Sequence, residues 1–246
     1  MTHSFFSATQ KTCIKFLLIS PVLLALTPAV AAELNSVRLL SQSGFESLSK
    51  DLAAVTALRA LSPGVTLGTL GFDLGLEVAV TKIDHGDIWN RAGGGSVDVV
   101  TPRLTIHKGL AAGFDMGASI GSVSGSGLQT IGGILRYQLI APGVVMPGAT
   151  IRLSGNREIG SSSVTVRSLG ADFVIAKPLV LITPYVGIGT VRTETSAPGT
   201  ILSSVSTNQA RAFVGFDSRL AFATFSAEVE KLGNTTTISS KIGFRF

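Results

Sequence analysis

The segment FDLGLEVAVTK, residues 72–82, decides the fold class of this chain. Successive side chains of a β-strand point to opposite faces of the sheet. One face of this segment would therefore carry Asp73 and Glu77. The other face would be entirely apolar, because apolar residues occupy every second position: Phe72, Leu74, Leu76, Val78 and Val80.

The same period of two recurs along the rest of the chain, although several of the later segments follow it less regularly. Gly- and Pro-rich joints separate these segments, which is typical of antiparallel hairpins. The pattern predicts about ten strands, within a range of 8–12. The candidate strands are 70–82, 100–107, 114–121, 130–139, 149–154, 164–176, 181–193, 209–217, 224–230 and 235–246.

Short and longer connections alternate between the candidate strands, so the longer ones would gather at one end of the sheet. An up-and-down barrel with short turns at one end and longer loops at the other has this layout. The shorter joints are 108–109, 141–148, 177–178 and 218–221. The longer loops are 84–96, 122–127, 155–163, 195–206 and 231–234.

The composition is too apolar for an ordinary soluble domain. Of 246 residues, 45% are hydrophobic and 14% are charged, whereas soluble domains carry about 25% charged residues. Disorder is excluded, because it requires low hydrophobicity and high charge. The net charge is only +5 and the basic residues form no cluster along the sequence, so nucleic-acid binding is not expected. After Glu33, no apolar stretch is long enough for a transmembrane helix.

Residues 1–32 are predicted to be a secretory signal peptide. Lys11 and Lys15 precede the short apolar run 16–26, and small residues follow as far as Ala32. The single cysteine, Cys13, lies within this segment, so the mature chain has no thiol for disulfides, catalysis or metal binding. His3 is one of only three histidines. We therefore predict no metal site and no cofactor.

The direction of the apolar face separates a membrane barrel from a soluble one. A membrane barrel turns its apolar face outward to lipid and its polar face inward. The predicted polar faces are rich in Gly, Ser and Thr, their charges are few and of both signs, and the last strand is aromatic. These features favour an all-β, antiparallel transmembrane barrel over residues 70–246. A soluble periplasmic β protein is the alternative.

The ending Ile242-Gly243-Phe244-Arg245-Phe246 resembles the C-terminal signal of Gram-negative outer-membrane β-barrel proteins. The resemblance implies that the protein is in the bacterial outer membrane, where it contacts lipid. It also implies that the barrel assembly machinery recognises Ile242, Phe244 and Phe246 of the last strand. The layout is also similar to small, uncharacterised proteobacterial barrels, some of which are grouped with fatty-acid-transporter-like proteins.

Residues 33–69, which precede the barrel, are predicted to contain a helix. Ser43 and Glu46 have the spacing of a capping box, and Ser62-Pro63-Gly64 would end the helix. This segment could plug the lumen, dock on the barrel rim, or lie on the membrane surface as an amphipathic helix. Its apolar face comprises Phe45, Leu48, Leu52, Val55 and Leu58.

The predicted lumen is narrow and filled by side chains, since about eight strands enclose an interior that side chains just fill. Closure of the barrel would place Lys241 and Arg245 of the last strand beside Asp73 and Glu77 of the first. Buried charges need partners, and the signs of the inward charges permit pairing. The predicted network comprises Asp73, Glu77, Arg103, His107, Asp115, Arg136, Arg152, Arg211, Asp217, Glu228, Glu230, Lys241 and Arg245.

The sequence favours a non-enzymatic barrel that passes or binds a small, apolar solute, or that has a structural role at the cell surface. The alternative is a lipid or peptide hydrolase in which His85, beside Asp84 or Asp87, acts as a general base. No G-x-S-x-G motif supplies a nucleophile for it. Trp89 and Tyr137 are predicted to lie at the membrane interface, where aromatic residues of such barrels gather, with ordinary packing inside the protein as the alternative.

Overall fold

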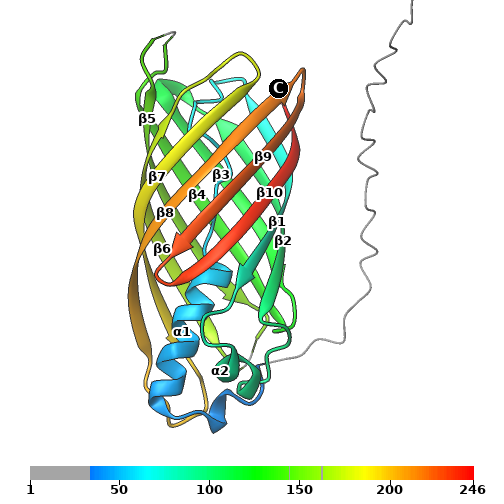
Figure 1. Ribbon diagram of the computed structural model, residues 1–246, viewed down its shortest axis with the longest axis vertical. Helices are drawn as coiled ribbons and strands as arrows, with labels where there is room; N and C mark the ends of the chain where they lie inside the picture. Colours follow the sequence, from blue (N-terminus) through cyan, green and yellow to red (C-terminus); the bar gives the residue numbers. More distant parts are fainter. Residues whose placement is uncertain (1–33, 144, 162) are drawn as a thin grey trace, which may run out of the picture.

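The protein is a closed barrel of ten antiparallel strands that follow one another in chain order, with the first strand paired to the last (Figure 1). The computed structural model describes residues 34–143, 145–161 and 163–246. The prediction of an all-β, up-and-down barrel of about ten strands is confirmed. The proposed signal peptide, Cys13 included, lies outside the described residues.

All ten candidate strands are present, and most are longer than predicted. The expected loop 155–163 is wrong in its first half, because β5 continues to Ile159. The connection between β7 and β8 is likewise shortened by longer strands. The strands are β1 (Phe72–Lys82), β2 (Asp98–Gly109), β3 (Phe114–Val123), β4 (Leu128–Ile140), β5 (Gly148–Ile159), β6 (Thr165–Ala176), β7 (Ile182–Ser196), β8 (Val205–Leu220), β9 (Ala223–Leu232) and β10 (Thr235–Arg245).

The two ends of the barrel differ. At one end, which we call the C-terminal end, β1 begins and β10 finishes. Here Phe72 and Phe246 exchange two backbone hydrogen bonds, with N···O distances of 2.7 and 3.0 Å. At the opposite end, the cap end, residues 34–41 lie beside the short helix α2 (Gly86–Arg91), which interrupts the β1–β2 loop (Figure 1). The sequence pattern did not predict α2.

The outer wall of the barrel is apolar and the lumen is polar. Along β1 every second residue is buried, and the exposed positions are those of the apolar series. This arrangement is the reverse of a soluble barrel and matches transmembrane barrels of the outer-membrane type. Aromatic side chains gather on the outer wall at the C-terminal end, as in an interfacial girdle: Phe72, Phe114, Tyr137, Phe222, Phe244 and Phe246. Among the described residues, no helix is long and apolar enough to cross a membrane.

The helix α1 (Gln42–Thr56) begins and ends earlier than the sequence predicted. Its N-cap is Ser41, whose side chain accepts a hydrogen bond from the Gly44 N–H at 3.2 Å. The predicted Ser43–Glu46 capping box is therefore wrong. Ser43 Oγ lies 3.1 Å from Ser41 Oγ instead. Ser41 and Ser43 both lie close enough before the apolar face to act as an N-cap. The spacing of Ser43 and Glu46 indicated Ser43, whereas the structure uses Ser41.

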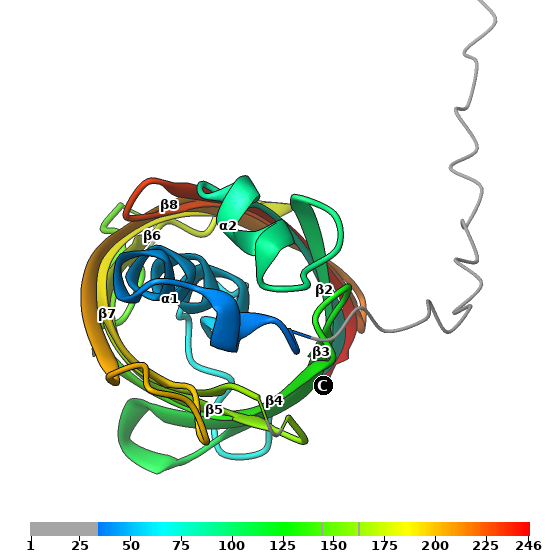
Figure 2. The same cartoon turned by 90° about the horizontal axis from the view of Figure 1, so that it is seen from below.

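Helix α1 lies inside the ring of strands (Figure 2). It enters from the cap end, and the chain that follows it crosses the lumen and joins β1 at the C-terminal end. Every residue from 51 to 64 is buried, including polar residues that a helix on the membrane surface would expose. The arrangement matches neither a helix docked on the rim nor one lying on the membrane. We call residues 34–71 the lumen segment.

The cap end is closed by an apolar core, which we call the cap core. It joins the first turns of α1 to strand ends that turn apolar residues inward. Trp89 of α2 is fully buried in it, so the prediction that Trp89 lies at the membrane interface is wrong. Gly94 is required there, because a Cβ at this position would collide with the indole ring. Its main members are Leu34, Val37, Phe45, Leu48, Leu52, Val55, Ile83, Trp89, Val99, Val123, Leu128, Val164 and Val166.

Candidate functional site

Between the cap core and the C-terminal end, the lumen holds buried charges of both signs. Inward side chains of the strands, together with Arg59 of the lumen segment, supply seven cations and seven carboxylates, so this region has no net charge. The cations are Arg59, Arg103, Arg136, Arg152, Arg211, Lys241 and Arg245. The carboxylates are Asp73, Glu77, Asp115, Asp172, Asp217, Glu228 and Glu230.

The first group of ion pairs spans the seam between β1 and β10. Asp73 Oδ1 accepts from Lys241 Nζ at 2.9 Å, and its Oδ2 lies 2.6 Å from Arg245 Nη2. Arg245 also pairs with Asp217 at 3.0 Å. The buried His107 ring lies 3.9 Å from Asp73. The structure thus brings Lys241 and Arg245 to Asp73, as closure of the barrel was expected to do. Glu77 lies opposite Lys241 in the strand register but does not pair with it.

A second group holds the C-terminal end of α1. Arg103 pairs with Glu77 at 3.2 Å. The same guanidinium donates to the carbonyls of Val55 and Thr56 at 3.1 and 3.2 Å. The last carbonyls of a helix have no partner within the helix, and the helix dipole favours a cation there. Arg103 therefore links the barrel wall to the end of the helix.

A third group attaches the chain just after α1. Arg59 pairs with Glu230 at 2.8 Å and also donates to the Ala54 carbonyl at 2.7 Å. Glu230 in turn accepts from Arg211 at 2.6 Å, and Arg211 pairs with Asp172 at 3.1 Å. The network predicted from the sequence contains neither Arg59 nor Asp172. Asp172 could have been identified from the alternation of β6, because it shares the inward-facing positions of that strand with Ser168.

Further along the lumen segment, Ser62 binds two wall arginines. Its hydroxyl accepts from Arg136 at 2.6 Å, and its carbonyl accepts from Arg152. The Arg152 guanidinium also lies over the Phe213 ring, 5.0 Å from its centroid, a cation–π contact. Glu228, another predicted carboxylate of this region, accepts a hydrogen bond from the Tyr185 hydroxyl at 2.9 Å.

The lumen segment is fixed once more near the C-terminal end. Asp115 Oδ1 accepts from the Thr66 hydroxyl at 3.2 Å and from the Leu67 N–H at 3.1 Å. Its other oxygen lies 3.5 Å from Arg136. Together with the contacts of Arg103, Arg59 and Ser62, these bonds attach the segment to the wall along its whole path. The segment is thus an integral part of the lumen.

His85 meets a carboxylate that the sequence did not assign to it. Its Nδ1 lies 3.2 Å from Asp51 of α1, and its Nε2 lies 3.9 Å from Asp84. Asp51 also accepts the backbone N–H groups of Asp84 and His85 at 3.2 and 3.1 Å. Burial raises the pKa of the Asp51 carboxyl, and His85 opposes that rise. Asp51 thus clamps the β1–β2 loop to α1.

The other predicted residues lie apart from this clamp. Asp87 is in the first turn of α2. Ile242, Phe244 and Phe246 point outward at the C-terminal end and are exposed. In the described residues, no group of three or more His, Cys, Asp or Glu side chains could hold a metal ion.

Comparison with known proteins gives matches of architecture alone. No family model matches the chain, and no curated protein matches it. A KdgM porin in complex with disordered oligogalacturonate is 11% identical with a TM-score of 0.39, covering 71% of this chain and 99% of the porin. The translocator domain of autotransporter NalP from Neisseria meningitidis is 10% identical with a TM-score of 0.43, covering 83% of this chain and 97% of that domain.

LpxR from Salmonella typhimurium is 10% identical with a TM-score of 0.39, covering 70% of this chain and 99% of LpxR. Likeness at this level concerns the barrel fold only. The identification of this chain as a transmembrane β-barrel of the outer-membrane type follows from its own apolar outer wall and polar lumen.

Glu230→Gln is predicted to destabilise the barrel strongly, because it removes the carboxylate that lies between Arg59 and Arg211. Breaking a buried ion pair costs about 3–5 kcal/mol. The measurement is the free energy of unfolding in urea for the protein folded into phospholipid vesicles. The control is Glu194→Gln, which breaks an exposed pair with Arg192 at 3.5 Å and should cost less than about 1 kcal/mol. Equal effects of the two substitutions would contradict the assignment.

Proposed function

We propose that the protein is a non-enzymatic barrel of a Gram-negative outer membrane whose lumen is kept closed by residues 34–71. In this state it acts as a structural protein at the cell surface and conducts no ions. The observation that carries the proposal is the continuous burial of residues 51–64 inside the ring of strands (Figure 2).

The two ends of the lumen segment are tied to opposite ends of the barrel. At the cap end, Gln42 and Ser203 exchange two hydrogen bonds at 3.0 and 3.2 Å. At the C-terminal end, Asp115 holds Thr66 and Leu67. Opening the lumen requires the segment to leave. Arg59 would then lose its ion pair with Glu230, and Arg103 would lose its bonds to the carbonyls of the segment. Such a barrel remains closed at rest.

Passage of a small solute is the secondary role that this geometry allows. The solute would cross only after the lumen segment has been displaced. Arg59 would leave with the segment, so the exposed wall would then carry six cations and seven carboxylates. With an excess of one negative charge, its field would favour cations over anions only weakly. A small uncharged solute with polar groups suits such a wall better than an ion.

We assign no catalytic role to His85, Asp84 or Asp87. The carboxylate nearest to His85 is Asp51, which already accepts two backbone N–H groups of the same loop. A general base needs a substrate placed at hydrogen-bond distance from it. The contacts of His85 instead support a structural role, in which the loop that carries α2 is fastened over the cap core.

The full-length protein in planar bilayers is predicted to show no steady conductance. A variant that lacks residues 34–69 should show discrete openings with little ion selectivity, provided that it still migrates as a folded, heat-modifiable band. In the full chain, Arg59→Ala should produce brief openings, because it removes the ion pair with Glu230. The control is Lys50→Ala, which changes an exposed residue of α1 in the same lumen segment. Steady conductance of the full-length protein would contradict the proposal.

We also propose that the outward-facing Ile242, Phe244 and Phe246 are the signal that the barrel assembly machinery recognises. Phe246→Ala keeps both backbone bonds to Phe72 and removes only the exposed ring. This variant should therefore fold into vesicles as the parent does, but it should insert poorly into the outer membrane of cells. Phe173→Ala, which removes an exposed ring from the outer face of β6, is the control. Normal insertion of Phe246→Ala in cells would contradict the signal.

A further inference from the structure

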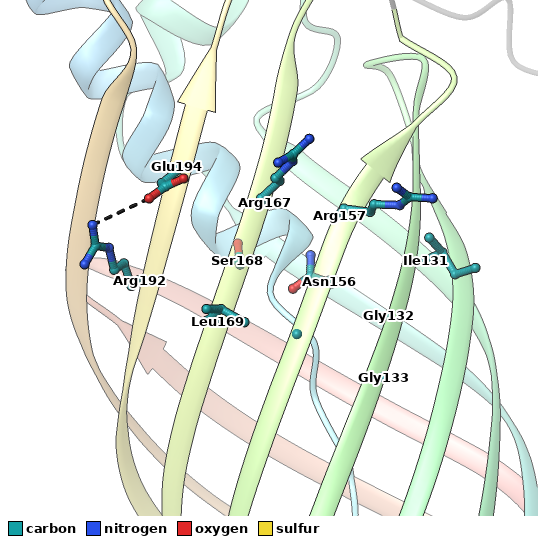
Figure 3. Close-up of a pocket in the computed structure, with 11 residues that line it drawn as sticks. Ile131, Gly132, Gly133, Asn156, Arg157, Arg167, Ser168, Leu169, Arg192 and Glu194 are labelled. Atoms are coloured by element: carbon teal, nitrogen blue, oxygen red, sulfur yellow. Dashed lines mark ion pairs between the residues drawn. The ribbon is translucent and has the colours of Figure 1, made fainter.

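The outer wall carries a group of arginines near the cap end that the lumen does not use. Arg157 of β5, Arg167 of β6 and Arg192 of β7 point outward from neighbouring strands and are exposed. Figure 3 shows their side chains around a single hollow in the wall. In the part of the chain that the structure describes, Arg157 and Arg167 have no ion-pair partner among the salt bridges of the molecule.

The hollow has a volume of about 800 Å³. It exists because Gly133 and Gly155 face outward there and have no side chain. A Cβ at Gly133 would meet only the Gly117 carbonyl oxygen, at 3.7 Å, so the space above it is open. Ile131 and Leu169 border the hollow with apolar surface.

The charges around the hollow are unbalanced. Arg157 stands directly opposite Arg167 in the β5–β6 register, and like charges at directly opposed positions destabilise a sheet. The one carboxylate at the rim, Glu194, stands opposite Arg167 in the β6–β7 register but pairs with Arg192 at 3.5 Å (Figure 3). Three cations thus share one carboxylate. A bound anion between Arg157 and Arg167 would replace their repulsion with charge-assisted hydrogen bonds.

The hollow lies where the exposed apolar residues of the outer wall give way to charged residues, towards the cap end. On β6, the exposed series runs through Ile175, Phe173 and Leu169 and then reaches Arg167. On β5, the exposed Leu153 is followed two residues further by Gly155 and then by Arg157. The apolar part of the hollow therefore faces hydrocarbon, and its cationic part faces the headgroup layer. The longest loop of the barrel, 83–97, is at this end, which by the usual rule faces the cell exterior.

We propose that this hollow binds a phosphate-bearing lipid of the outward-facing leaflet. The phosphate lies between Arg157 and Arg167, whose planar guanidinium groups donate paired hydrogen bonds to phosphate oxygens. One acyl chain lies over Gly133 and Gly155, between Ile131 and Leu169. Free phosphate would use only the cationic part, whereas a lipid fills both parts. This site is on the opposite side of the wall from the lumen and does not depend on the proposed function.

Native mass spectrometry of the folded protein in detergent tests the site, with lipid A as the phosphorylated probe and phosphatidylcholine as the zwitterionic comparison. We expect lipid A to bind in preference to phosphatidylcholine, and Arg167→Gln to raise its apparent Kd at least tenfold. Gly133→Leu, which fills the hollow without changing any charge, should weaken binding similarly. Lys231→Gln, which removes one exposed cation from the outer face of β9, should leave the Kd unchanged.

Three results would overturn the proposal. If Lys231→Gln raised the Kd for lipid A as much as Arg167→Gln does, headgroups would be attracted to the basic rim as a whole and not to this hollow. Displacement of lipid A by millimolar inorganic phosphate, together with unchanged binding to Gly133→Leu, would mean that the site takes an anion and no acyl chain. Parent-like binding by Arg167→Gln would remove the phosphate contact. Each variant is first checked for heat-modifiable migration, so that loss of folding is distinguished from loss of the site.

Discussion

Closure of the sheet is the constraint on which the rest of this structure depends. In hydrocarbon no water can satisfy a backbone N–H or C=O group, so a membrane-spanning sheet must have no open edge. Here β1 and β10 meet along their whole length. At the C-terminal end of that seam, Asp73 bridges the two strands through Lys241 and Arg245. Backbone closure and the pairing of buried charge therefore occur at the same place.

Closure creates an interior that must also be filled, and the lumen segment fills most of it. At the cap end the filling is apolar, because α1 packs against strand ends that turn Val and Leu inward. Nearer the C-terminal end the filling is polar, and wall arginines donate to carbonyls of the segment at Val55, Thr56 and Ser62. The segment thereby gives buried cations partners that the opposite wall does not supply.

The sequence predicted the strands well because one simple property, alternation, identifies each of them. The segments that alternated poorly have a physical explanation. Val166 of β6 and Val164 just before it point inward into the cap core, while Thr165 and Arg167 take the outer face, so the inward face at this end is apolar instead of polar. The position of the helix was not predictable to the same degree. The apolar face of Phe45, Leu48 and Leu52 requires an apolar partner, but its periodicity does not say whether that partner is lipid, rim or lumen.

The sequence identifies most of the residues in the charge network, but it does not show which of them pair with one another. Asp73 was expected near Lys241 and Arg245, since closure fixes which strands are neighbours. The pairing of Arg59 with Glu230 depends on the path of the lumen segment, which no local pattern encodes. The clamp between Asp51 and the β1–β2 loop is of the same kind, because it joins residues whose proximity arises only once α1 is inside the barrel.

The most direct measurement of the central claim is amide hydrogen exchange of the protein folded in phospholipid vesicles. If residues 51–64 lie in the lumen of the membrane-embedded barrel, their amides should exchange slowly, at rates comparable with those of the strands around them. Gly199 and Ile201, which are exposed in the loop between β7 and β8, supply the fast reference within the same sample. Exchange of residues 51–64 as fast as that loop would contradict the account, because it would place the segment in water and leave the barrel unfilled.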